Sequence, residues 1–596
     1  VYALSSYSDF HQKLLDFKVG SMVMDVVDLE IKRHALRERE KAGRGGAPES
    51  AEDEKRDRVR LRKQEKLLYV CLHVLLNLAE DINTERKMCN YGIVPMLTAM
   101  LGRQNADLLI LVVAFLKKLS IFQENADEMA KARLGDKLIA FVPNKHEQLL
   151  EQVLHLLFNL SFHPKCRAQL GKAGLTPKLL SLLRKGRHRL LAVRLLYQLS
   201  AQDDERAKMS QSVPMLVGTV INTPDPSLIP PEVLALVVNL MTNAECARAC
   251  ARARGALRGL VTLGVRHQHH LALKVLRNMS AHEGADHCEE LARTYAADLL
   301  AVVRHGESVE VQVEAMAILA NLPLDQVEEL PDLAVEVDLL GLLQQQLEPG
   351  HADDDVVLEA CRLAGALAAH DGCAPAMARA GTLLQSLAEA LDHKQEDDEI
   401  VLAVVFAFYR LLFNADAREV ILTETQLVTT LLDLLGDKNA AIRRHASLAL
   451  DLVMEHDTTG HWPLRIRDRK YRMHNQEWLD AVEEDDVEQY EEAMAFNEAR
   501  GKIGGVHDIA ELDQDEDGSD DGVPSSRSRL DYEAGGYADG YGAEYGLDMR
   551  APGELAGHAH AYGALSDEAY LGMGVNESDS YDDGEEEDYD DEVEED

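Results

Sequence analysis

The stretch LLNLAEDINTERKMCNYGIVPML, residues 75–97, joins an apolar helical pattern ending at Leu78 to a glycine, Gly92, that precedes a second apolar run. Its first part returns about every 41 residues, as LKKLSIF around Leu119 and LFNLSFH around Leu160. The later occurrences centre on Leu199, Leu240, Met279, Leu322, Leu367, Leu411 and Leu452. A period of about 42 residues in helix-favouring sequence is typical of armadillo and HEAT repeats, which bury their apolar faces by stacking on neighbours.

A second marker runs in phase with the first. Glycines precede apolar runs at Gly92, Gly135, Gly174, Gly255 and Gly381, and weaker versions occur at Ser212 and Thr425. Because glycine adopts the left-handed conformation that ends one helix and turns into the next, the marker favours a three-helix armadillo unit over a two-helix HEAT unit. We therefore expect an all-α fold, a right-handed armadillo-repeat superhelix of about ten repeats followed by a disordered acidic tail.

The charge of the chain is concentrated at its C-terminal end. Of a net charge of −42, residues 476–596 contribute −35, from 40 Asp and Glu against 5 Lys and Arg. Few aliphatic residues and charge of one sign predict a solvated segment. The expected organisation is a solenoid over residues 1–483 with a charged helical insertion at about 38–66 and a C-terminal cap at about 461–483. An acidic linker over 484–509 and a disordered tail over 510–596 follow.

Several function classes are disfavoured by composition. Nucleic-acid binding needs a basic surface, which an acidic chain lacks, and the longest apolar run, Leu108–Leu116, is too short to span a membrane. The eight cysteines occur singly and indicate reduced thiols of a cytoplasmic protein. Cys246 and Cys250 with the nearby histidines His267, His269 and His270 lack paired metal-ligand motifs. We expect no enzyme activity, cofactor, metal site or small-molecule substrate.

The third helix of each armadillo unit is expected to line a concave groove. The residue before each repeating leucine, and the residue one turn earlier, should point into that groove. The candidate partner-binding residues at these positions are Asn77, Lys118, Asn159, Arg194, Gln198, Asn239, Lys274, Asn278, Asn321, Arg362 and Arg410. A ladder of amides can hold the backbone of an extended peptide; alternatively, the amides bond to neighbouring helix ends within the solenoid.

The charges at these positions predict the kind of partner. Two groove positions in each of ten repeats give twenty inner positions. Five of them are cationic and only Asp451 is acidic, so partner segments with acidic and aliphatic residues are expected. Importin-α-type receptors place tryptophan four residues before the asparagines, and no tryptophan stands at those positions here. Binding of nuclear-import signals is therefore disfavoured.

Two segments of the C-terminal region, one basic and one acidic, each have two possible roles. Arg469, Lys470, Arg472 and Trp478 belong to a segment that either caps the last repeat or docks a partner. Residues 577–596 contain 14 acidic residues and either occupy the groove as a weak competitor or act only as a solubilising tail.

Longer runs of the sequence resemble the kinesin-associated protein family, the non-motor accessory subunits of heterotrimeric kinesin. They are LLILVVAFLKKLSIFQEN (108–125), residues 75–97 quoted above, QEDDEIVLAVVFAFYRLLF (395–413), YRMHNQEWL (471–479), residues 9–36 and the charged hairpin at 43–66. The resemblance covers about residues 9–482. It implies an adaptor that binds the C-terminal tails of two kinesin motor subunits and links them to cargo, notably intraflagellar transport proteins in cilia and flagella. The alternative is a β-catenin-like junctional or signalling scaffold that binds acidic partner segments.

Overall fold

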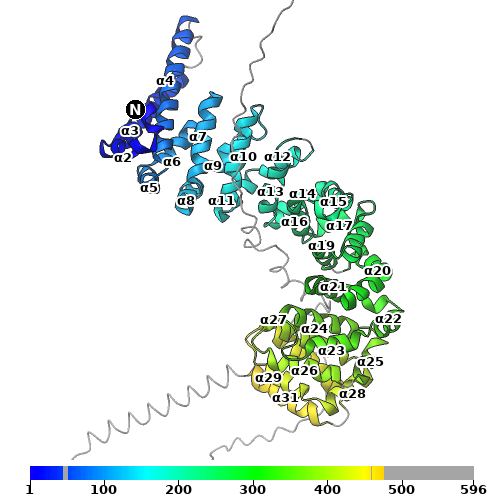
Figure 1. Ribbon diagram of the computed structural model, residues 1–596. Coiled ribbons are helices and arrows are strands. Elements are labelled where there is room, and N and C mark those ends of the chain that lie inside the picture. The colour runs from blue at the N-terminus through cyan, green and yellow to red at the C-terminus, as the bar shows by residue number, and fades with distance from the viewer. Residues whose placement is uncertain (44–50, 185, 283, 381, 458–459, 476–596) are drawn as a thin grey trace, which may run out of the picture. The chain divides into compact units, whose positions relative to one another are not determined.

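The computed structural model describes residues 1–43 and 51–475, apart from residues 185, 283, 381, 458 and 459 (Figure 1). Throughout these residues the regular structure is helical, and they contain no strand. The chain divides into two compact units, a first unit of Val1–Leu322 and a second that begins at Pro323. The expected linker and acidic tail, residues 484–596, and most of the expected cap beyond 475 lie outside the described residues.

The first unit consists of stacked groups of short helices. It opens with α1 (Tyr2–Ser5), α2 (His11–Asp16), α3 (Val19–Gly43) and α4 (Ala51–Leu78). Three-helix groups follow: α5 (Ile82–Asn90), α6 (Ile93–Met100) and α7 (Ala106–Leu119); α8 (Gln123–Lys131), α9 (Leu134–Leu138) and α10 (Glu147–Ser161); α11 (Pro164–Lys172), α12 (Leu175–Leu182) and α13 (Arg189–Leu199). The unit ends with α14 (Asp203–Met209), α15 (Val213–Ile221) and α16 (Pro231–Leu240); α17 (Ala244–Arg252), α18 (Ala256–Val261) and α19 (His270–Ser280); and α20 (Asp286–His305) with α21 (Val309–Asn321).

The second unit repeats the same plan. Its helices are α22 (Leu330–Glu336), α23 (Leu339–Leu347), α24 (Asp354–Ala368), α25 (Cys373–Arg379), α26 (Thr382–His393), α27 (Asp398–Leu411), α28 (Ala415–Glu424), α29 (Leu427–Leu434), α30 (Ala440–His456) and α31 (His461–His474). With α4, α7, α10, α13, α16, α19 and α21, the helices α24, α27 and α30 make ten helices that contain or directly precede the repeating leucine or methionine; we call these the third helices. The predicted all-α armadillo-repeat fold is confirmed.

The repeating apolar residues form the core. Leu119, Leu199 and Leu411 are completely buried, and the residues at the other early repeats are almost so. The last repeat differs, because Leu452 is only half-buried while Leu450 and Val453 of the same helix are buried. The core position of this repeat is therefore taken by Val453, one residue after the repeating leucine.

Left-handed residues begin the second helix of several repeats. Gly92, Gly174 and Gly255 have φ angles of 89°, 80° and 73° and precede α6, α12 and α18 as predicted. Gly135 does not, because Arg133 takes the left-handed conformation with φ of 51°. Gly135 lies inside α9, where a Cβ would approach Leu170 Cδ2 to 2.7 Å, so the glycine serves close packing rather than a turn.

The remaining repeats make the turn in other ways. Asp338 precedes α23 with φ of 49°, although it is not a glycine. Thr425 is extended, and Ser212 is right-handed, so these weaker markers do not adopt the left-handed conformation. Between Asp286 and His305 no turn is made at all, because α20 continues through the place where other repeats change helix. Gly381 lies outside the described residues.

The charged segment at 38–66 extends two long helices. Helices α3 and α4 pack against each other, and residues 44–50 between them are outside the described residues. At the base of this hairpin Gln64 Nε2 donates to Glu30 Oε2 at 2.7 Å, and Arg103 Nη1 donates to Gln64 Oε1 at 3.1 Å. All three side chains are buried, so the polar network fixes the hairpin on the following repeat.

The third helices of the second unit approach closely. A Cβ on Gly365 of α24 would lie 3.1 Å from Phe406 Cδ1 and 3.4 Å from Ala407 Cα of α27. Glycine therefore allows the Phe406 ring to rest on the α24 backbone. At the end of the unit α31 packs on α30, where Ile466 is completely buried.

No single helix among the described residues is long and apolar enough to cross a membrane. One pair, α16 with α17, meets the length and composition criteria together, but it is bent by 115°.

Candidate functional site

The third helices lie beside one another within each unit. In the first unit α7 contacts α10, and the series continues through α13, α16, α19 and α21; in the second unit α24 contacts α27, which contacts α30 (Figure 1). All eleven predicted partner-binding residues are on third helices. We call the side that carries these residues the third-helix face.

The amides of this face bond to the preceding repeat. Asn278 Nδ2 donates to the carbonyl oxygen of Val238 at 2.9 Å, and Asn239 Nδ2 donates to Ser200 Oγ at 3.0 Å. Asn159 and Asn321 likewise reach Ser120 Oγ at 3.0 Å and Ser280 Oγ at 3.1 Å. Asn77 donates in the same way to Ser5 Oγ of α1 at 3.1 Å. Bonding within the solenoid, one of the two interpretations of the ladder, is thus present.

The serine acceptors occupy one sequence position. Ser120, Ser200 and Ser280 each follow the repeating leucine or methionine directly. Sequence reasoning treated the asparagines alone, although the recurring Leu-Ser or Met-Ser pair was a signal for their partners. Each amide also lies near the last turn of the preceding third helix, where carbonyl groups lack helical donors.

Three of the predicted amides are hardly accessible. Gln198 is 4% exposed, Asn239 is 5% exposed and Asn278 is 7% exposed. Gln198 Nε2 and Asn239 Oδ1 are buried without a hydrogen-bond partner. A peptide lying on the face could reach these atoms only after local rearrangement, whereas Asn77, Asn159 and Asn321 are half-buried and nearer the surface.

Acidic residues missed by sequence reasoning neutralise three of the cations. Arg194 Nη2 lies 2.8 Å from Glu232 Oε1, and Arg362 Nη1 lies 2.9 Å from Glu359 Oε2. Lys274 Nζ lies 3.9 Å from Glu314 Oε1. Glu232, Glu314 and Glu359 each stand eight residues before the repeating leucine, one helical turn beyond the positions considered. Three of the five cations therefore have carboxylate partners within the solenoid.

Arg410 has a different environment. Its guanidinium carbon lies 5.3 Å from the centre of the Phe406 ring, and its Nε is buried without a hydrogen-bond partner. Among the described residues no carboxylate lies within ion-pair distance of it. Phe406 in turn lies 6.2 Å from the His445 ring, so the guanidinium rests on an aromatic cluster.

Burial shifts two histidines of the face. It lowers the pKa of His73 and that of His155, and Lys117 lowers the pKa of His155 further. Both imidazoles are thereby favoured in their neutral form, which donates and accepts hydrogen bonds.

The two cysteines considered as metal ligands lie in the packed interior. Cys246 and Cys250 are buried in α17, and burial raises the pKa of each thiol to about 12. Across the described part of the chain, no group of three or more His, Cys, Asp or Glu side chains is arranged to hold a metal ion.

The predicted cap residues lie on α31. Lys470 Nζ donates to Asp451 Oδ1 at 2.6 Å and to the Ser447 carbonyl at 3.1 Å, which ties α31 to the last third helix. Arg472 Nε lies 3.1 Å from Asp468 of its own helix, and Arg469 is half-buried. Trp478 lies outside the described residues.

Comparison with known proteins finds similar solved structures. Among solved structures the chain is similar to an engineered protein, with a TM-score of 0.51 and 19% identity over 65% of this chain and 95% of that chain. Another structure, from work on a phosphorylation switch between cadherin and β-catenin, gives a TM-score of 0.49 and 19% identity over 66% and 81%. The likeness to the engineered protein bears on the fold alone.

The family comparison covers more of the chain. The family model described as kinesin-associated protein (KAP) matches residues 1–514, which include every residue that the structure describes. The chain therefore belongs to the kinesin-associated protein family.

Proposed function

We propose that the chain is the non-enzymatic adaptor subunit of a heterotrimeric kinesin. In this role it binds the C-terminal tails of two motor subunits and links them to cargo such as the intraflagellar transport machinery of cilia and flagella. The observation that carries the proposal is the family match over residues 1–514. The expected setting is the cytoplasm and its cytoskeleton, including the cilium.

The third-helix face is the proposed binding surface for a motor tail. Stacked third helices present equivalent positions at successive repeats, which suits an extended segment that contacts several repeats in turn. Because the amide donors already bond within the solenoid, a tail would depend more on cationic and aromatic side chains than on an amide ladder.

Arg410 is the position where we expect the strongest polar contact. A guanidinium binds a carboxylate through two parallel hydrogen bonds, and stacking on Phe406 holds its plane in place. Arg194 and Arg362 already have carboxylate partners, so a ligand would have to compete for them. An acidic residue of the tail should therefore bind at Arg410 in preference to those arginines.

The test is co-expression of the chain with two kinesin motor subunits, followed by size-exclusion chromatography and affinity measurement with their isolated tails. Arg410→Gln should weaken tail binding about tenfold, the loss expected for a charge-assisted hydrogen bond, and Arg410→Lys should weaken it less. Lys438→Gln removes one exposed charge from the same unit but outside the third-helix face, and should leave affinity unchanged.

Two results would overturn the proposal. One is a chain that forms no complex with motor subunits. The other is equal loss of tail binding for Arg410→Gln and Lys438→Gln, which would show that net charge rather than the third-helix face determines binding. Tight binding to acidic cadherin-like segments without any motor association would favour the junctional scaffold instead.

A further inference from the structure

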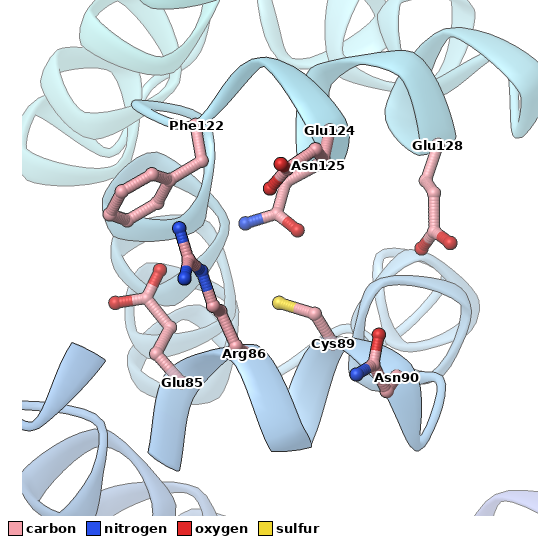
Figure 2. Close-up of a pocket in the computed structure, with 8 residues that line it drawn as sticks. All are labelled: Glu85, Arg86, Cys89, Asn90, Phe122, Glu124, Asn125 and Glu128. Atoms are coloured by element: carbon pink, nitrogen blue, oxygen red, sulfur yellow. The ribbon is translucent and has the colours of Figure 1, made fainter. Parts of the chain in front are cut away.

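A pocket opens between the first helices of two neighbouring repeats, away from the residues discussed above. Figure 2 shows side chains of α5 and α8 pointing toward each other across it. Its volume is about 410 Å³, within the range of small ligand sites. Three carboxylates line it, Glu85, Glu124 and Glu128, against one cation, Arg86.

Glu85 lacks a partner for its charge. The residue is 4% exposed, and its Oε1 is buried without a hydrogen bond. Burial raises the pKa of Glu85, and Lys118 acts in the opposite direction without forming an ion pair with it. A buried carboxyl with an unused acceptor is costly, so this atom points to a missing donor.

The next junction along the chain arranges its charges in the opposite order. There Asp127 of α8 faces α11, and it lies 3.2 Å from His163 Nε2 and 3.7 Å from Lys165 Nζ. Lys165 stands 41 residues after Glu124, and His163 stands 41 residues after Phe122. At the α5–α8 junction the equivalent of the lysine is therefore an acid, and the equivalent of the histidine is an aromatic ring. Asp127 in turn stands 41 residues after Arg86, so the acid and the cation of this pair are exchanged at the α5–α8 junction. Glu85 corresponds to Ala126 and is an additional carboxyl group outside that pair.

We propose that the pocket between α5 and α8 binds an arginine side chain of a partner polypeptide. The carboxylates supply acceptors for the guanidinium, and the half-buried Phe122 ring at the rim supplies an aromatic face on which it stacks. A guanidinium fits these groups better than an ammonium, since it is planar and donates along two parallel directions. The site lies between first helices and does not depend on the identity of the motor tail.

The experiment uses the full chain and tripeptides of known chemistry. Saturation-transfer NMR titrations compare acetyl-Gly-Arg-Gly-amide with the same peptide carrying citrulline or lysine. Citrulline keeps the shape of arginine and removes its charge. The arginine peptide should bind at least fivefold more tightly than the citrulline peptide and also more tightly than the lysine peptide.

Variants with opposite expected signs assign the binding to the pocket. Glu85→Gln, which is nearly isosteric, should weaken binding of the arginine peptide at least fivefold, and Glu124→Gln, at an exposed position, should weaken it less. Arg86→Gln should tighten binding, because it removes the like charge. Circular dichroism melts confirm that each variant is folded.

The proposal fails if the arginine and citrulline peptides bind equally, or if folded Glu85→Gln and Arg86→Gln change affinity in the same direction. Equal affinity of the arginine and lysine peptides overturns the assignment of a guanidinium. None of these results bears on motor-tail binding, so the two proposals stand or fall separately.

Discussion

Asn278 of α19 donates through Nδ2 to the carbonyl oxygen of Val238, 40 residues earlier in α16, at 2.9 Å. Val238 lies in the last turn of α16, where the backbone carbonyl groups have no N–H donor within the helix. The side chain of one repeat thus satisfies the end of the helix before it. Asn159 and Asn321 also reach a carbonyl oxygen of the preceding third helix, at Lys117 (3.3 Å) and at Arg277 (3.5 Å), although those carbonyls accept from other donors as well.

The amide ladder should contribute to stability. Asn278→Ala leaves the buried Val238 carbonyl without its donor and should lower the free energy of unfolding by about 1–3 kcal/mol. Urea denaturation followed by circular dichroism measures the change. Asn222→Ala is the matched control, since Asn222 donates to Gly218 within its own helix in an exposed position, and it should cost well under 1 kcal/mol. Equal effects of the two variants would contradict a stabilising role for the ladder.

The left-handed glycines should be sensitive to substitution for a conformational reason alone. Gly174 has φ of 80°, and a Cβ there would meet nothing within 4 Å. Gly174→Ala should therefore destabilise the chain by about 1–2 kcal/mol through backbone strain and not through a clash. Gly102 is equally uncrowded but does not have a positive φ, so Gly102→Ala should be neutral or slightly stabilising. Thermal melts of both variants distinguish strain from crowding.

The pH dependence of stability should reveal His155. Its pKa in the folded state is lowered from 6.5, chiefly by burial and next by Lys117. As the pH falls below 6.5, the unfolded chain takes up a proton that the folded chain does not, so this histidine reduces stability until its folded pKa is passed. The stability of His155→Gln relative to the parent chain should therefore increase as the pH is lowered from 7.5 to 5.5. A constant difference in melting temperature across this range would refute the assignment.

Two substitutions separate capping from docking in α31. Ile466→Asp places a charge at a completely buried position and should destabilise the second unit by several kcal/mol. Arg469→Gln should leave stability unchanged if the segment is a cap alone. If Arg469→Gln instead weakens partner binding in a fully stable protein, the basic residues are a docking site as well, and binding assays beside thermal melts would show it.

The sequence predicted the repeat well because burial is periodic. Leu119, Leu199 and Leu411 could be placed in the core from spacing alone, since a residue at the same point of each unit meets the same neighbours. Glycine markers predicted the turns at Gly92, Gly174 and Gly255 for an equally local reason. Arg133 and Asp338 could not be identified in this way, because non-glycine residues adopt the left-handed conformation only where the surrounding packing imposes it.

The candidate site was predicted less fully. The eleven residues were correctly placed on third helices, but their partners lie on other repeats about 40 residues away. The pairing of Arg194 with Glu232 depends on how far one helix is offset against the next, which residue spacing within a single helix does not determine. The pocket at Glu85 was missed because its acids come from two first helices, and the sequence argument considered only the third.

The contrast between the third helices of the two units bears on how each can vary among relatives. In the first unit an asparagine reaches the preceding repeat, whereas at the corresponding places in the second unit stand Ala366, Arg410 and Asp451. There Gly365 lets the Phe406 ring rest on the α24 backbone, so contact depends on shape. Among relatives, substitutions in the first unit should be disfavoured where they remove an amide that bonds to the preceding repeat. In the second unit, selection should remove any substitution that adds a larger side chain at residue 365, whether that side chain is polar or apolar.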